Sequence, residues 1–256
     1  AAAEAARATR DATPRLRASV LRERAWVAVR RGDPQAETFA REARDVSREA
    51  DGDRSRTYGT ACGNLARVLK DLGRNAEAEQ EFLVQYEIYR ELSGERHANT
   101  AIALLPLGNC RRRLEKFEEA RADFEVAVSI FAAEMGEESL LTARAKLSLA
   151  IVDIEEGKLD DAEKRLDSVL ATVRSLDPSA RTDEGQTLLT LARIAFARGR
   201  GDEEARLVDA GLRALTEGLA NELFTLTRFL ADHEAKARKL GRTDFLDAIE
   251  RARKKP

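Results

Sequence analysis

The sequence has few of the residues that all-β folds and disulfide frameworks require. Aromatic residues make up 5% of the 256 residues, and there are only 15 glycines and 5 prolines. Because β-sheets need many turns and strands rich in β-branched or aromatic residues, these values disfavour an all-β fold. Two cysteines, Cys62 and Cys110, are too few for a dense disulfide framework. Each lies within a helical pattern, so we expect it to be a small core residue.

An excess of one charge and a long apolar run are also lacking. With 44 basic and 46 acidic residues, the formal net charge is −2, which gives no signal for a nucleic-acid partner. No stretch is apolar for long enough to cross a membrane, and the first residues lack the apolar core of a signal peptide. We therefore expect a cytoplasmic location, no membrane insertion and no nucleic-acid partner. The chain does not begin with Met, so we expect a piece of a longer protein or a processed product.

Groups suited to catalysis or metal binding are scarce. The only histidines are His97 and His233, and their spacing suits no metal site. No glycine-rich phosphate loop follows a strand pattern. The stretch Asp51-Gly52-Asp53 lacks the later ligands of a calcium loop, so it is interpreted as a connector. We expect no catalytic residue, no metal and no cofactor, and therefore no enzyme.

The sequence is rich in the strong helix formers Ala, Leu, Glu and Arg, and 43% of its residues are hydrophobic. A pattern recurs along it, in which a small residue follows a turn at Ala78, Ala120, Ala162 and Ala205, at spacings of 42, 42 and 43 residues. The same phase extends back to Ala36. We predict an N-terminal linker or extra helix over residues 1–14. About six helical pairs follow, over roughly 15–50, 57–93, 98–135, 140–176, 182–217 and 222–254.

Each repeat is predicted to be a helical hairpin. In the second unit, the first helix carries apolar residues at three- and four-residue spacing from Leu65 to Leu72. Gly73 and, two units later, Gly157 are expected to end first helices in the left-handed conformation. The second helix of a pair begins with acidic residues, which suit the positive end of its dipole. Its core positions are Phe82, Phe124 and Leu166, and the preceding alanines let the two helices approach closely. Because helices of this length are marginal alone in water, stability must come from stacking of the hairpins.

These positions resemble the tetratricopeptide repeat. The first helices carry Leu65-Ala66, Leu107-Gly108, Leu149-Ala150 and Leu191-Ala192, and Glu119-Ala120 begins a second helix. The spacing of 42 is longer than the usual 34 and is similar to the kinesin light chain subgroup, as is the stretch from Glu87 to His97. The resemblance covers roughly residues 15–254. It implies an all-α, right-handed superhelical solenoid of antiparallel helix pairs that binds proteins or peptides, but it is weak evidence for any particular partner.

In that subgroup, asparagines on successive first helices hold the backbone of an extended peptide. The matching column here is Asn64, Pro106, Ser148 and Thr190, so only its first member is Asn. The resemblance therefore does not supply a complete peptide clamp. Pro106 also lacks an amide donor, and we expect it to kink or break its helix near residue 102. The interpretation of Pro106 as a tolerated kink is favoured over a deliberate change in groove shape.

The first helices are expected to line the concave face, where a partner would bind. Projection of the register predicts a partner-binding set rich in Arg, amide and hydroxyl groups: Thr60, Asn64, Arg67, Asn109, Arg112, Arg113, Arg144, Ser148, Gln186, Thr190 and Arg193. Arg side chains pair well with carboxylates, so an acidic segment is the expected ligand.

Three functions stay open from the sequence. The first is a protein- or peptide-binding scaffold, and we favour it. The second is a regulatory or substrate-positioning domain of a larger signalling protein. The third is a self-associating structural module, although homo-oligomerisation is not indicated by any feature of the sequence. The arginine-rich, lysine-poor composition is typical of a bacterial protein.

Overall fold

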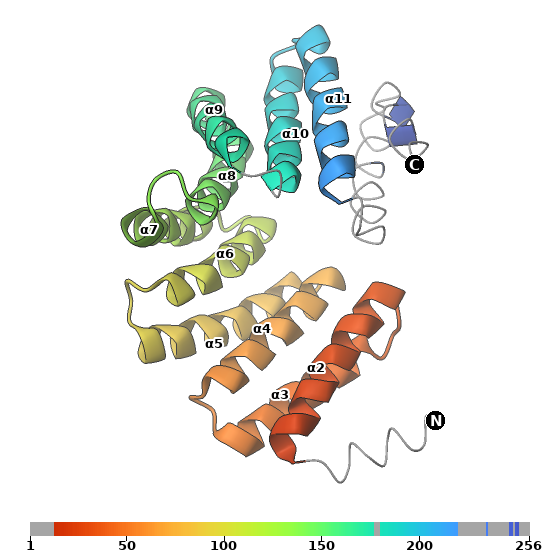
Figure 1. Ribbon diagram of the computed structural model, residues 1–256, viewed down its shortest axis with the longest axis vertical. Coiled ribbons are helices and arrows are strands. Elements are labelled where there is room, and N and C mark those ends of the chain that lie inside the picture. Colours follow the sequence, from red (N-terminus) through yellow and green to blue (C-terminus); the bar gives the residue numbers. More distant parts are fainter. Residues whose placement is uncertain (1–12, 177–179, 220–233, 235–245, 248, 251–256) are drawn as a thin grey trace. The chain divides into compact units, whose positions relative to one another are not determined.

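The computed structural model describes residues 13–176, 180–219, 234, 246–247 and 249–250. Within these residues the protein is all-α, with ten helices and no strand (Figure 1). The helices are α2 (Pro14–Arg31), α3 (Ala36–Asp51), α4 (Arg56–Asp71), α5 (Asn75–Ser93), α6 (Ala98–Arg113), α7 (Phe117–Met135), α8 (Leu140–Glu155), α9 (Leu159–Ser175), α10 (Arg181–Ala197) and α11 (Gly201–Gly218). The all-α prediction is confirmed. Most of the predicted pair 222–254, and most of residues 1–14, lie outside the described residues.

The chain divides into two compact units, Ala1–Ile130 and Phe131–Pro256, and the division falls within α7. In the first unit, hairpin α2–α3 packs on hairpin α4–α5, which packs on α6. In the second unit, α8–α9 packs on α10–α11. The first helices of the hairpins are α2, α4, α6, α8 and α10, and the second helices are α3, α5, α7, α9 and α11.

Glycine ends the first helices of most hairpins. Gly73 has a φ of 79°, its N–H bonds the carbonyl of Lys70 at 3.0 Å, and the N–H of Arg74 bonds the carbonyl of Leu69 at 2.9 Å. This pair of bonds is the Schellman motif, which satisfies carbonyls at a helix end and favours glycine because it has no Cβ. Gly157 has the same φ of 79°. The two predicted glycine stops are therefore confirmed.

Glu115 occupies the same place after α6, with a φ of 61°. A side chain with a Cβ is strained in this left-handed region, and glycine is not. We expect Glu115→Gly to raise the free energy of unfolding by about 0.5–1 kcal/mol. Urea unfolding measures it, and Gly157→Glu, as the reverse change, should lower stability by a similar amount or more. Equal stability of Glu115→Gly and the natural chain would contradict this cause.

The connectors between hairpins also repeat. Gly52, Gly94 and Gly136 have φ values of 83°, 97° and 92°. Three residues after each glycine, a side chain caps the next first helix. The Ser55 hydroxyl accepts from the amide of Tyr58 at 3.2 Å, and the His97 Nδ1 accepts from the amide of Asn99 at 3.0 Å. His97 is therefore a helix cap, which satisfies an amide left open at the helix N-terminus.

The predicted core positions are confirmed. Ala78, Ala120 and Ala162 are fully buried, as are Phe82, Phe124 and Leu166. The fifth anchor was wrong, because Ala205 is exposed and Glu204 is the buried residue, 42 positions after Ala162. The repeat spacing does not lengthen to 43 at this hairpin. Residue size misled the alignment there, because the position that is small in three hairpins is occupied by Glu204.

Pro106 does not break α6, which runs from Ala98 to Arg113 without interruption. The expectation of a break near residue 102 was wrong. The flanking residues Ala103 and Leu107 are each 1% exposed, so their packing on the neighbouring helices holds the helix together despite the missing amide donor.

A charge network inside the first unit joins α5, α6 and α7. The Arg111 Nη1 lies 2.7 Å from the Asp123 Oδ1, and its Nε lies 3.3 Å from the Glu79 Oε1. The Lys116 Nζ also bonds Glu79, at 2.8 Å. Burial raises the pKa of Asp123 to about 6, and the adjacent Arg111 opposes this rise. One repeat later the charges of the pair are exchanged, with Asp153 bonded to Arg165 at 3.1 Å.

Candidate functional site

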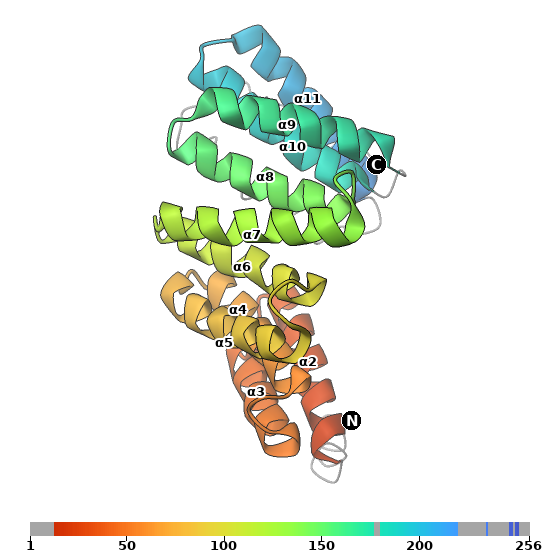
Figure 2. The ribbon, with the colours of Figure 1, turned by 90° about the vertical axis from the view of Figure 1, so that its left-hand side faces the viewer.

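The candidate site is the exposed face of the first helices, and each unit contributes its own part. In the first unit, α5 lies in front of α4 when viewed from the side of the second helices (Figure 2). The predicted partner-binding residues of α4 and α6 therefore lie on the side opposite that view. Thr60 and Asn64 are half-buried, and Arg67 is exposed. The Thr60 hydroxyl lies 2.9 Å from the Tyr89 hydroxyl, which ties this part of the face to α5.

Helix α6 supplies the other predicted residues of the first unit. Asn109 is half-buried and its Nδ2 donates to the carbonyl of Leu105 at 2.9 Å, so its oxygen still faces outward as an acceptor. Arg112 is half-buried and Arg113 is exposed. Within the described part of the chain, neither Arg67 nor Arg113 has an ion-pair partner. Two exposed guanidinium groups on neighbouring first helices are thus available to carboxylates.

Trp26 is a residue of this face that the sequence reasoning missed. It is the only tryptophan of the chain, and 57% of it is exposed on α2. The glycines after α2 and α4, Gly32 and Gly73, lie 41 residues apart, and the same offset puts Trp26 in the column of Arg67. The projection began at α4 and omitted the first hairpin, whose offset differs by one residue. A lone tryptophan 41 residues before Arg67 was the signal that could have found it.

In the second unit, the predicted cations are already paired within the fold. The Arg144 Nε bonds the Asp183 Oδ1 at 2.6 Å and its Nη2 bonds the Oδ2 at 2.9 Å. This bidentate pair joins α8 to α10. Arg193 lies 3.9 Å from Glu155, which also joins the two helices. The sequence did not predict Asp183 as the partner of Arg144, because the two residues lie 39 positions apart.

The remaining predicted residues of the second unit are less accessible than expected. Ser148 donates to the carbonyl of Arg144 at 3.1 Å, and Gln186 is half-buried. Thr190 is only 6% exposed and donates to the carbonyl of Gln186 at 2.7 Å. The structure therefore leaves the stronger case for a binding face with Trp26, Arg67 and Arg113 in the first unit.

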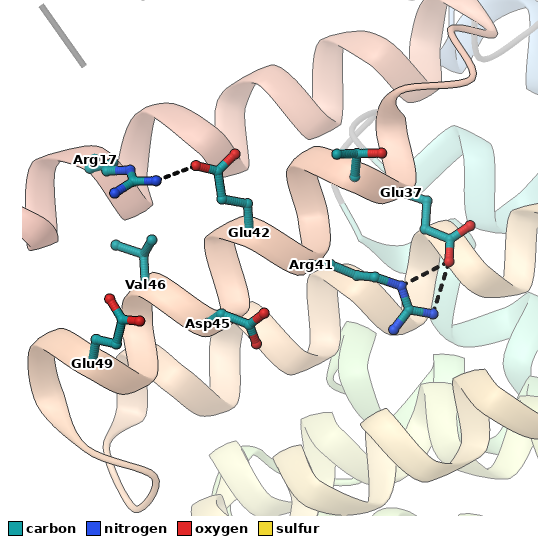
Figure 3. A pocket seen from close by; sticks show the side chains of 8 residues that line it. Arg17, Glu37, Arg41, Glu42, Asp45, Val46 and Glu49 are labelled. Carbon is teal, nitrogen blue, oxygen red and sulfur yellow. Dashed lines mark hydrogen bonds and ion pairs between the residues drawn. The ribbon is translucent and has the colours of Figure 1, made fainter. Parts of the chain in front are cut away.

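A separate depression of about 540 Å³ lies on the first hairpin, away from this face. It is lined by charged side chains of α2 and α3, and Figure 3 shows them bonded to one another. Arg17 pairs with Glu42, and Arg41 bonds Glu37 at 2.8 Å. Because these cations are neutralised by their own neighbours, the depression is a weaker candidate than the face that contains Trp26.

The chemistry of a catalytic or metal centre is not assembled in the described ranges. Within them, no group of three or more His, Cys, Asp or Glu side chains could hold a metal ion. Burial raises the pKa of Cys62 to about 12 and that of Cys110 to about 11, so both thiols stay protonated at neutral pH. None of the described helices has both the length and the apolar character needed to span a bilayer.

Comparison with known proteins identifies the class of protein. The tetratricopeptide repeat model matches residues 56–133 and again residues 100–175. The chain is a tetratricopeptide-repeat protein. No curated protein sequence matches it.

Solved structures place the fold among kinesin-light-chain-like repeats. The chain is similar to BtubC (BKLC) from P. vanneervenii, with 24% identity, a TM-score of 0.62, and coverage of 74% of this chain and 76% of that one. It is also similar to the TPR-like repeats assigned to a kinesin light chain of Podosopora anserina, with 18% identity, a TM-score of 0.63, and coverage of 80% and 97%. The Rap conjugation gene regulator of plasmid pLS20, in complex with the Phr* peptide, gives 13%, 0.60, 85% and 67%. At these identities the likeness establishes the fold.

Proposed function

We propose that this protein is a scaffold that binds an acidic peptide segment of a protein partner on the first-helix face of residues 1–130. The observation that carries the proposal is the alignment of Trp26, Arg67 and Arg113 on α2, α4 and α6. Trp and Arg are the residue types that most often dominate binding energy at protein interfaces. Arg presents a fork of donors that matches a carboxylate, which makes acidic side chains the expected ligand.

The amides beside these cations support an extended ligand. Asn64 and Asn109 lie next to Arg67 and Arg113 in the repeat register, and both are half-buried. An amide side chain can bond the N–H and C=O groups of a peptide backbone, which repeat whatever the sequence of the peptide. The Rap regulator of the same fold is solved in complex with a peptide. We infer that backbone bonds give this chain general affinity and that the two arginines select acidic sequences.

The test uses Trp26 as the reporter, because no other tryptophan contributes to the fluorescence. A randomised twelve-residue peptide library is selected on the protein, and the enriched peptides are expected to be rich in Asp and Glu. Binding of a synthetic enriched peptide should change the Trp26 emission. We expect Arg67→Glu combined with Arg113→Glu to weaken that peptide about 30-fold or more, because each reversal replaces an attraction by a repulsion.

Arg206→Glu is the matched control, because Arg206 is an exposed arginine on the second helix α11. It should leave peptide affinity unchanged. Affinity of the natural chain should also fall as salt is raised from about 0.05 to 0.5 M, since exposed charge pairs are screened. Selection of basic or neutral peptides, or full binding by the double variant, would rule out this face as an acidic-peptide site.

A further inference from the structure

The outer side of α2 carries an apolar stripe that faces no neighbouring helix in the described part of the first unit. Val20, Arg24, Val27 and Arg31 lie at helical spacing along it, and Val20 and Val27 are 36% and 43% exposed. The helices that pack on α2 are α3 and α4, and neither covers this stripe. Exposed valines at i and i+7 on one helix face are unusual unless something packs there.

The same stripe is covered on every other first helix. Its members in α4 are Ala61, Leu65 and Val68, which are 1%, 0% and 5% exposed. The corresponding residues of α6, α8 and α10 are also buried: Ala103, Leu107, Cys110, Ala145, Leu149, Val152, Thr187, Leu191 and Ile194. In the second unit, Leu191 and Ile194 of α10 belong to one hydrophobic cluster with Leu166, Val169 and Val173 of α9.

This cluster shows what the stripe does. It packs against the second helix of the preceding hairpin, and the same pairing of elements recurs as α3 with α4 and α5 with α6. On α2 the stripe keeps the apolar residues of such a contact. Together with Phe39 of α3 it lines a depression of about 520 Å³. The depression is therefore equivalent to the groove that seats a helix at each later junction.

The charge at the end of this groove is reversed relative to the later junctions. There, a basic residue next to the turn of the hairpin bonds a glutamate of the preceding second helix. Glu37 pairs with Arg74 at 2.7 Å, Glu79 with Lys116 at 2.8 Å and Glu163 with Arg200 at 3.2 Å. Each pair is separated by 37 residues. In the first hairpin the residue in the place of Arg74 is Asp33, which is exposed.

We propose that the groove lined by Val20, Val27 and Phe39 is a docking site for one α-helix of a partner protein. That helix presents small aliphatic residues to the two valines and a lysine or arginine to Asp33. The reversed charge excludes the acidic position that the second helices of this chain carry, so the groove selects a helix of different sequence. This site is separate from the first-helix face, because Val27 and Trp26 lie on different sides of α2 in the repeat register.

The test uses a probe taken from this chain. A labelled peptide with the sequence of residues 75–93, the helix α5 that fills such a groove, is made in its natural form and with Glu79→Lys. Fluorescence anisotropy measures binding to the whole protein. We expect the Lys form to bind about fivefold or more tightly than the natural form, since it exchanges repulsion from Asp33 for attraction. In Asp33→Arg protein the preference should reverse.

Val27→Asp should weaken the Lys peptide about tenfold or more, because it places a charge in the apolar groove. Val126→Asp is the matched control, since Val126 is 46% exposed on α7, and it should bind normally. Thermal unfolding checks that both variants are folded. Arg67→Glu with Arg113→Glu should leave helix binding unchanged, which separates this site from the peptide face.

Three results would overturn the proposal. The first is binding that ignores Val27→Asp or shows the same preference in Asp33→Arg protein. The second is a mass by light scattering that rises with concentration and is restored to the monomer by Val27→Asp, which would assign the groove to a second copy. The third is a tenfold gain in peptide affinity on removal of residues 1–12, which would assign it to that segment.

Discussion

Arg111→Leu is expected to lower the free energy of unfolding by about 3 kcal/mol or more. The side chains of Arg111 and Asp123 are 19% and 9% exposed, and they are 2.7 Å apart. Removal of the cation leaves a buried carboxylate without its partner, which is the most damaging way to break such a pair. Urea unfolding of both proteins at pH 8 measures the difference.

The double variant Arg111→Leu with Asp123→Leu should recover most of that loss. Two apolar side chains of suitable volume often replace a buried ion pair at little cost. The chain contains a precedent, because Ala195 and Leu207 take these places in α10 and α11. Glu79 keeps its bond to Lys116 at 2.8 Å, so it is not stranded by the change. A double variant no more stable than the single one would show that the pair is not the cause.

The loss in Arg111→Leu should also depend on pH. The pKa of Asp123 is already raised to about 6 by burial, and loss of the opposing Arg111 raises it further. A carboxyl group with a higher pKa in the folded state stabilises the fold when protonated, and this contribution disappears as pH rises through its folded value. The variant should therefore lose less stability at pH 5 than at pH 8. An equal loss at both values would contradict the unpaired-carboxylate explanation.

Ala120→Arg is expected to cost about 3 kcal/mol or more, through overpacking of α6 against α7 and burial of a charge. Ala120 is fully buried. The space beside it is small, because a Cβ placed on Gly108 of α6 would lie 2.8 Å from the Phe124 ring. An arginine cannot be accommodated there unless the helices separate. Thermal unfolding of the variant measures the effect.

Two control variants test the register at the same time. Ala122→Arg lies two residues away on the exposed side of α7, and it should change stability by no more than about 0.5 kcal/mol. Ala205→Arg should be equally mild, because Ala205 is exposed. A large loss in Ala205→Arg would restore the 43-residue spacing that the structure contradicts.

Much of the fold could be predicted because helical hairpins are local structures. Helix formers, glycine stops and buried positions recur every 42 residues, and each is decided by neighbours close in sequence. The buried columns of Ala78 and Phe82 were found in this way. The method failed where residue identity departed from the pattern, as at Glu204, where a buried glutamate stands in a small-residue column.

The candidate site could be predicted only in part. The register placed Arg67 and Arg113 on one face, and the structure leaves both exposed. It could not show that Arg144 bonds Asp183, because that pairing depends on how one hairpin packs on the next. Periodicity reports the side of a helix on which a residue lies, and it does not report which groups of another helix satisfy it.

The sequence by itself determined the class of fold, the positions of the hairpins and most of the buried columns, because these depend on a repeated local pattern. The tertiary structure decided which polar residues remain open to a partner. It joined Trp26 to the face of Arg67, paired the cations of the second unit, and left the stripe of α2 uncovered. The physical reason is that the availability of a side chain is set by its neighbours in space, and packing between hairpins brings those neighbours from distant positions in the chain.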